Sequence, residues 1–225
     1  FAGLIQVGES VKEPLKYYQN NLACGVNLLE SMKENNVKKI IFSSTAAVFG
    51  NPTTVPISEN DPKRPINPYG EAKYFFEQVI KSSSLAWGLS YTIFRYFNAC
   101  GATDVVCENH QNESHLIPLI FQAAQGVRPN LVIYGTDYDT PDGTCIRDYV
   151  HVEDLISAHL LAIDYMNKNQ RNEFNLGNGS GYSVKEVVEA VEKEIMEKSR
   201  HHRGGLLGKD DPALFNIHLQ LQLPG

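Results

Sequence analysis

The sequence predicts an α/β protein built on a parallel, doubly wound sheet, because helical and strand patterns alternate along its first hundred residues. Apolar residues recur every three or four positions over 15–32, as in a helix with one buried face. An apolar run over 37–42 indicates a buried strand, and a helix over 68–83 and a strand over 90–97 follow. Helix, strand, long loop, helix and strand is the order typical of a doubly wound sheet.

Each of these elements has its own signal. The strand over 37–42 runs into the small polar residues Ser43, Ser44 and Thr45. Residues 51–68 carry five prolines, so we expect an extended loop there. The helix after this loop should turn four apolar residues inward: Phe75, Phe76, Val79 and Ile80.

The pattern changes after Gly101, where a polar, irregular stretch begins. We expect helices over 116–124 and 154–166, and short strands over 131–134 and 173–176. Ser183 and Glu186 form a capping box, which predicts the start of a last helix. The tail from Phe215 alternates apolar and polar residues, as a strand does.

Composition excludes several classes of function. A net charge of −6 argues against a nucleic-acid partner, because phosphate binding needs clustered Lys and Arg. No stretch approaches the roughly 18–20 apolar residues of a membrane span. The four cysteines (Cys24, Cys100, Cys107 and Cys145) form no C-x-x-C pair and no zinc spacing with histidine. We therefore expect no metal site and a reducing, cytoplasmic environment.

Tyr69 and Lys73 are the first candidates for chemistry. They lie four residues apart, which places both on one face of a helix. A neighbouring ammonium favours phenolate and lowers a tyrosine pKa, so such a phenol can take a proton from a substrate hydroxyl. Of the 11 tyrosines, only Tyr69 has a lysine four residues later. A surface pair on any helix has the same spacing, so the spacing alone leaves both readings open.

Thr45 adds a second candidate. It ends a strand 24 residues before Tyr69, and the carboxyl ends of parallel strands meet the ligand crevice. A hydroxyl at that place can bond the same substrate oxygen, although a helix cap or a turn also uses such a residue.

A series of short segments carries a resemblance to a known family. They include Val-Gly-Glu-Ser (7–10), Tyr-Tyr-Gln-Asn-Asn (17–21), Phe-Ser-Ser-Thr-Ala-Ala-Val-Phe-Gly (42–50), Asn-Pro-Tyr-Gly-Glu-Ala-Lys (67–73), Arg-Tyr-Phe-Asn-Ala-Cys-Gly-Ala (95–102), Asp-Gly-Thr-Cys-Ile-Arg-Asp-Tyr-Val-His-Val (142–152) and Asn-Leu-Gly-Asn-Gly (175–179). In this order, over residues 1 to about 192, the chain resembles the extended branch of the short-chain dehydrogenase/reductase superfamily and, within it, the UDP-glucose 4-epimerases (UDP-galactose 4-epimerases).

The resemblance implies a partial Rossmann-like sheet whose first strands and Gly-rich phosphate loop lie before Phe1, so that the chain is expected to be a fragment. Residues 1–101 would be the remainder of the NAD-binding domain. Residues 102–199 would form a smaller α/β substrate-binding region, with returns to the sheet near 150–155 and 173–177. Residues 200–225 would be a divergent tail. The implied assembly is a homodimer.

The resemblance also implies roles for individual residues. Tyr69 would be the general base on the sugar O4, Lys73 would hold the nicotinamide ribose, and Thr45 would bond the same hydroxyl as Tyr69. Five further residues would touch NAD: Phe1, Ala2, Gly3, Asn20 and Phe97. Five would contact the UDP-sugar substrate: Asn98, His115, Leu116, Tyr134 and Arg147.

Ala46 and Ala47 help to choose among relatives. The 4,6-dehydratases of this branch carry an Asp-Glu pair right after the strand-end threonine, and alanine has no proton to move. The resemblance therefore favours epimerisation at C4 by transient oxidation with NAD. Two alternatives stay open: a catalytically inactive truncated form, and a related nucleotide-sugar epimerase or decarboxylase.

Overall fold

The computed structural model describes residues 2–103, 113–202 and 219–222, with side chains described up to 195. Its contacts divide the chain into two compact units, Phe1–Val105 with Tyr149–Ser180, and Val106–Asp148 with Gly181–Gly225. The first unit is therefore closed by a segment that returns to it late in the chain. The functional division into a cofactor region and a substrate region stays a prediction.

A three-stranded parallel sheet forms the centre of the first unit. Strands β1 (Lys39–Thr45), β2 (Ser90–Tyr96) and β6 (Arg171–Leu176) lie in the order β1-β2-β6. Thr45 pairs with Tyr96, and Tyr96 with Leu176, so the three carboxyl ends are level. The predicted parallel sheet is confirmed, and β1 continues through Ser43 and Ser44 to Thr45.

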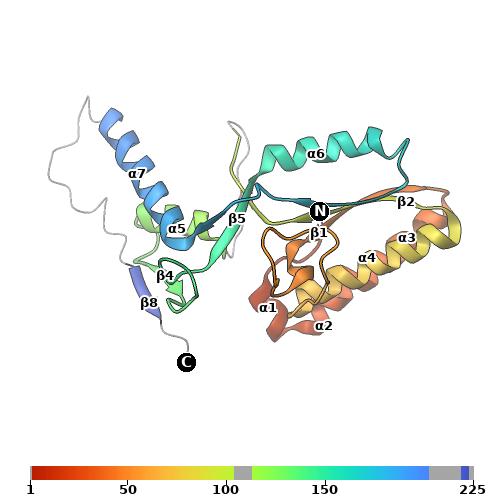
Figure 1. Ribbon diagram of the computed structural model, residues 1–225, viewed down its shortest axis with the longest axis horizontal. Coiled ribbons are helices and arrows are strands. Elements are labelled where there is room, and N and C mark those ends of the chain that lie inside the picture. The colour runs from red at the N-terminus through yellow and green to blue at the C-terminus, as the bar shows by residue number, and fades with distance from the viewer. Residues whose placement is uncertain (1, 104–112, 203–218, 223–225) are drawn as a thin grey trace. The chain divides into compact units, whose positions relative to one another are not determined.

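Helices cover both faces of this sheet. α3 (Cys24–Glu34) and α4 (Pro68–Trp87) lie on one face, and α6 (Val152–Tyr165) lies on the other (Figure 1). Successive side chains of β2 point to opposite faces of the sheet. Ile93 packs toward α4, and the next residue, Phe94, packs against His159 of α6. This arrangement confirms the doubly wound class.

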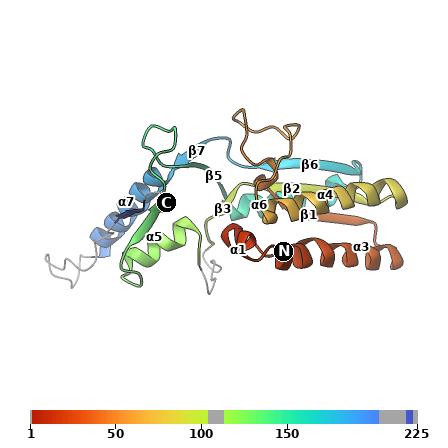
Figure 2. The same ribbon diagram turned by 90° about the horizontal axis from the view of Figure 1, so that it is seen from below.

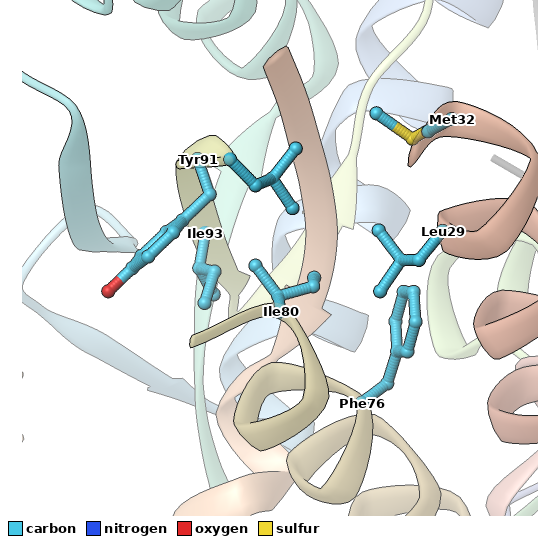
Figure 3. Close-up of a cluster of buried hydrophobic side chains, with 7 residues drawn as sticks. Leu29, Met32, Phe76, Ile80, Tyr91 and Ile93 are labelled. Carbon is cyan, nitrogen blue, oxygen red and sulfur yellow. The ribbon is translucent and has the colours of Figure 1, made fainter. Parts of the chain in front are cut away.

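The main core lies between α3, α4 and the sheet. Leu29 and Met32 of α3 face Phe76 and Ile80 of α4, and the cluster continues to Ile93 (Figure 3). Three of the four apolar residues expected to turn inward from α4 do so. The expectation for Phe75 is wrong, because its side chain is 45% exposed and lies on the outer side of the helix.

The predicted helix over 15–32 consists of three consecutive helical segments. α2 (Pro14–Tyr17) leads into the π-helix η1 (Tyr18–Ala23), which leads into α3. The wide π turn lets two successive asparagines bind one peptide: Leu4 N donates to Asn20 Oδ1 at 3.3 Å and to Asn21 Oδ1 at 2.8 Å. α1 (Val7–Lys12) precedes α2 and had no clear sequence signal.

The proline-rich loop between β1 and α4 is closed at its base. β1 ends in a short 3-10 helix, η2 (Ala46–Phe49), which is followed by Gly50. Gly50 has a φ of +65°, and a Cβ there would lie 2.0 Å from the Arg64 carbonyl oxygen. The two ends of the loop therefore touch. Asn67 then caps α4 by accepting a hydrogen bond from Gly70 N at 2.8 Å.

The second unit contains the shorter elements. α5 (Leu116–Ala124) is followed by β4 (Leu131–Tyr134), which pairs in parallel with β8 (Leu219–Gln222). β5 (Ile146–His151) pairs antiparallel with β7 (Gly181–Ser183), and α7 (Val184–His202) follows (Figure 2). The predicted capping box is confirmed, because Ser183 N donates to Glu186 and Glu186 N donates to Ser183 Oγ.

Residues 149–151 of β5 pair with β3 (Asn98–Cys100), outside the three-stranded sheet, whereas 173–176 lie within that sheet, in β6.

Among the described helices, none has both the length and the apolar character that crossing a membrane requires. The described residues also contain no cluster of His, Cys, Asp and Glu able to hold a metal ion.

Candidate active site at the end of strand β1

The site begins where β1 ends and α4 starts. Thr45 is the last residue of β1 and is 9% exposed. Its Oγ1 accepts a hydrogen bond from Ala47 N at 3.2 Å and therefore caps η2. Its side chain also lies beside the phenol of Tyr69, in the first turn of α4, close enough to act on the pKa of that phenol. Local capping and the sheet thus place the threonine hydroxyl directly against the phenol.

Lys73 lies one helical turn after Tyr69 and also reaches β1. Its Nζ donates to the Ser43 carbonyl oxygen at 2.9 Å and lies 5.1 Å from the centre of the Phe42 ring. The side chain is almost fully buried, and this burial lowers the pKa of Lys73 to about 8. Tyr69 therefore lies against the Thr45 side chain and Lys73 against the Ser43 carbonyl, at the same end of the strand.

The protonation state of Tyr69 differs from the sequence expectation. Burial raises the pKa of Tyr69, and the neighbouring Thr45 hydroxyl only partly offsets this rise. The expectation that Lys73 acidifies the phenol is therefore wrong, since the pKa of Tyr69 lies above its ordinary value. The physical reason is that Lys73 points its ammonium at the Ser43 carbonyl, while desolvation disfavours phenolate.

The residues expected to hold NAD lie mainly around Gly3. A Cβ placed on Gly3 would lie 3.2 Å from Lys73 Nζ and 3.2 Å from Asn21 Oδ1. Because glycine has no side chain, the Gly3 backbone remains accessible directly beside the buried ammonium of Lys73. A cofactor could therefore approach the backbone closely at this position. Ala2, directly before Gly3, is exposed. Asn20 accepts a hydrogen bond from the backbone N–H of Leu4, directly after Gly3.

The other two expected NAD contacts have different positions. Phe97 follows β2 and donates its backbone N–H to the Leu176 carbonyl at 3.1 Å, so it lies at the carboxyl end of the sheet. Phe1 lies outside the described residues.

The expected substrate residues are divided between the units. Asn98 begins β3 in the first unit. His115 precedes α5, and Leu116 is the first residue of that helix. Tyr134 ends β4 and is 75% exposed, and Arg147 on β5 is exposed with Nη1 donating to the Ile146 carbonyl at 2.9 Å. The structure brings Thr45, Tyr69 and Lys73 together within one unit, and the roles of the residues in the second unit stay predictions.

The sequence interpretation missed a buried polar cluster under α4. Glu77 and Arg95 are both fully buried and paired, and Ser44 donates to Glu77 Oε1 at 2.5 Å. A signal was present, because Arg95 is the one charged residue of the predicted strand 90–97, and a buried charge requires a partner of opposite charge.

The NAD dependent epimerase/dehydratase family matches residues 1–177 of the chain. Among curated relatives, the chain is 52% identical over 192 residues to UDP-glucose 4-epimerase of Halalkalibacterium halodurans, a match that covers 84% of this chain and 58% of the relative. It is 49% identical over 201 residues to the Streptococcus mutans enzyme of the same name, covering 88% of this chain and 60% of that enzyme.

Solved structures agree with these relatives. UDP-glucose 4-epimerase from Bifidobacterium longum, in complex with NAD+ and UDP, superposes with a TM-score of 0.87 at 40% identity, covering 99% of this chain and 63% of that one. The Brucella ovis enzyme in complex with NAD gives 0.83 at 43% identity, covering 86% and 60%. The chain thus spans about three fifths of the length of its relatives. From the match over most of its residues, we conclude that the chain belongs to the NAD dependent epimerase/dehydratase family.

Proposed function

We propose that the protein containing this chain is a cytoplasmic UDP-glucose 4-epimerase, which inverts the C4 hydroxyl of a UDP-hexose with tightly bound NAD. The observation that carries the proposal is the position of Tyr69 beside the Thr45 hydroxyl and the buried Lys73, whose ammonium binds the Ser43 carbonyl at the carboxyl end of β1. Relatives at about half identity are named UDP-glucose 4-epimerase, and two similar structures hold NAD.

The residues of this chain would handle the proton at the sugar O4. Tyr69 would take the O4 proton as C4 is oxidised, and Thr45 would donate its hydroxyl to the phenolate oxygen that remains. The same phenol would return the proton when the other C4 epimer forms. Ala2, Gly3, Asn20, Lys73 and Phe97 would hold NAD, which supplies reversible hydride acceptance at C4 when bound.

Ala46 and Ala47 support epimerisation over dehydration. Both lie in η2 directly after Thr45, and they carry only methyl groups. Elimination of water needs a second acid or base beside the substrate, and neither position can supply one.

Replacing Tyr69 by Phe tests the proposal in a protein of the relatives' length that contains this chain. We expect interconversion of UDP-galactose and UDP-glucose to fall by about 10²- to 10⁴-fold, because the proton acceptor is gone while the ring is kept. Coupled measurement of UDP-glucose formation gives the rate. Exposed Tyr138 is the control position, and Tyr138→Phe should leave the rate unchanged. Full activity in Tyr69→Phe would refute the proposal.

Two alternatives are separated by simple measurements. If the unchanged protein turns over UDP-glucuronate or UDP-xylose but not UDP-galactose, it is a related decarboxylase or epimerase. If the 225-residue chain alone binds NAD with micromolar affinity, it is not an inactive remnant. We also infer a homodimer, with α3 and α4 at the contact, and sedimentation equilibrium of the longer protein would decide this.

A further inference from the structure

Three charged side chains lie along one face of α4 at four-residue spacing: Lys73, Glu77 and Lys81. Each reaches the sheet at a different place. Lys73 binds the Ser43 carbonyl on β1, Glu77 binds Arg95 on β2, and Lys81 binds Glu173 on β6 at 2.7 Å. Tyr69 begins the same series one turn earlier. Polar contacts therefore join α4 to all three strands of the sheet.

The central contact is the most constrained of the three. Arg95 Nε donates to Glu77 Oε1 at 3.0 Å, and Nη2 donates to Oε2 at 2.7 Å, which is a bidentate pair. Arg95 Nη2 also donates to Glu173 Oε2 at 2.5 Å, and the guanidinium carbon lies 5.4 Å from the centre of the Phe49 ring. Both members of the pair have fully buried side chains.

Stability alone does not explain such a pair. The cost of removing two charges from water offsets most of their attraction, so apolar residues of similar volume often serve equally well. Apolar contacts are non-directional, however, and permit small slides of a helix along a sheet. A bidentate ion pair with a third hydrogen bond is directional and therefore favours one axial position of the helix.

Ser44 connects this pair to the reacting groups. Its Oγ donates to Glu77 Oε1 at 2.5 Å, and it directly precedes Thr45. Ser44, Arg95 and Asn175 are register partners across β1, β2 and β6, in the row just before Thr45. Glu77 lies two helical turns after Tyr69. The distance from Tyr69 to Thr45 is therefore set by a second attachment between the same helix and the same strand.

We propose that Glu77, held by Ser44 and Arg95, is a positioning residue that sets the axial register of α4, so that Tyr69 and Lys73 meet Thr45 and Ser43. This inference rests on the proposed function for its catalytic consequence. Glu77 contacts Ser44 and Arg95, and it acts on the reacting groups only through the helix.

The variants follow from the contacts. Glu77→Gln keeps the volume but removes the charge and turns an N–H toward the donors of Arg95. Ser44→Ala removes one hydrogen bond and keeps the ion pair. A shift of about 1 Å in a reacting group costs roughly 10²-fold in rate. We expect kcat to fall about 10- to 100-fold in Glu77→Gln and less in Ser44→Ala, with KM for UDP-galactose changed by less than about threefold.

Ile80→Ala is the matched control. Ile80 is fully buried on the same helix, one turn from Glu77, and packs in the apolar core (Figure 3). Its truncation lowers the unfolding temperature but removes no directional contact. All variants are assayed at a temperature at which circular dichroism shows them folded. We expect Ile80→Ala to keep kcat within about twofold, although its loss of stability equals or exceeds that of Ser44→Ala.

A kcat within twofold of the unchanged protein in both Glu77→Gln and Ser44→Ala would overturn the inference, as would an equal loss in Ile80→Ala. If Glu77→Gln does not fold, Ser44→Ala alone decides. If the unchanged protein shows no epimerisation, the proposed function has failed, and crystal structures then decide the positioning role. A Tyr69 Oη displaced from Thr45 Oγ1 by more than about 0.5 Å in the variants supports it, and an undisplaced phenol overturns it.

Discussion

Lys73 shows how a single buried group couples charge to stability. Its ammonium is almost excluded from water and has the Ser43 carbonyl as its hydrogen-bond acceptor, so burial lowers the pKa of Lys73 to about 8 from an ordinary value of 10.5. Below pH 8 the group is protonated in both the folded and the unfolded chain. Between pH 8 and 10.5 the folded chain releases its proton first, so the unfolded chain holds more protons and stability rises with pH.

We therefore predict that the free energy of unfolding rises by up to about 3 kcal/mol between pH 8 and 10.5 relative to Lys73→Met. The methionine variant lacks the titrating group, so contributions from other residues cancel in the difference. Urea unfolding of both proteins without NAD at pH 7.5, 8.5 and 9.5 measures it. A constant difference over this range would contradict the prediction.

At this scale the sequence predicted which groups meet but not their acidity. The spacing of Tyr69 and Lys73 and the strand end at Thr45 are local properties, and all three side chains reach the same end of β1. The pKa of Tyr69 depends on how much water the folded chain excludes. That quantity comes from distant residues such as Tyr17, whose ring lies 6.5 Å from that of Tyr69.

At the scale of elements, Gly25 sets how closely α3 approaches α4. A Cβ on Gly25 would lie 2.6 Å from Cε2 of Phe76, whose ring is itself in the core cluster. Alanine normally favours a helix by up to about 1 kcal/mol over glycine. Overpacking of a rigid core costs about 1–3 kcal/mol, and Phe76 has little room to move.

We predict that Gly25→Ala lowers the free energy of unfolding despite the gain in helix propensity, by about 1–2 kcal/mol net. Gly8→Ala is the control, because Gly8 lies in α1 and a Cβ there would meet nothing within 4 Å. That variant should be neutral or slightly stabilising. Chemical denaturation of both variants measures the change in the free energy of unfolding. Equal changes in the two variants would contradict the prediction, because they would show that α3 and α4 move apart at no cost.

Long periodic elements were predictable, and short ones were not. α5 has the predicted bounds because its apolar periodicity lies within the segment, and α4 begins at the predicted proline, directly after its cap Asn67. β3 and β7 have three residues each, too few for any period. The π turn in η1 accompanies hydrogen bonds that Leu4 N donates to Asn20 and Asn21, which no local pattern encodes.

At the scale of the whole molecule, both units contain carboxylates that favour the charged form. The pKa of Glu173 in the first unit is lowered, since hydrogen bonds from Lys81 and Arg95 outweigh the opposing effect of burial. The pKa of Glu113 in the second unit is lowered, since hydrogen bonds from His115 and Ser114 likewise outweigh burial. Groups of this kind stabilise the fold above their unfolded pKa, and the contribution is lost as pH falls through the folded value.

We predict that the urea midpoint falls as the pH is lowered from 5 to 3, because the unfolded chain binds protons first over this range. In Glu173→Gln the decline should be shallower, since one of these carboxylates no longer titrates. Parallel denaturation series at pH 3, 4 and 5 would test both statements. A midpoint independent of pH in the unchanged chain would contradict them.

The closed base of the loop after β1 has a practical consequence for engineering. Gly50 touches Arg64, and Asn175 holds the far part of the loop by donating to the Ile57 carbonyl. Residues 51–54, by contrast, are exposed to solvent. Lengthening a loop whose ends are already pinned changes its closure entropy by only about 0.6 kcal/mol per doubling. An epitope tag inserted at this stretch should therefore be displayed without disturbing the entry into α4.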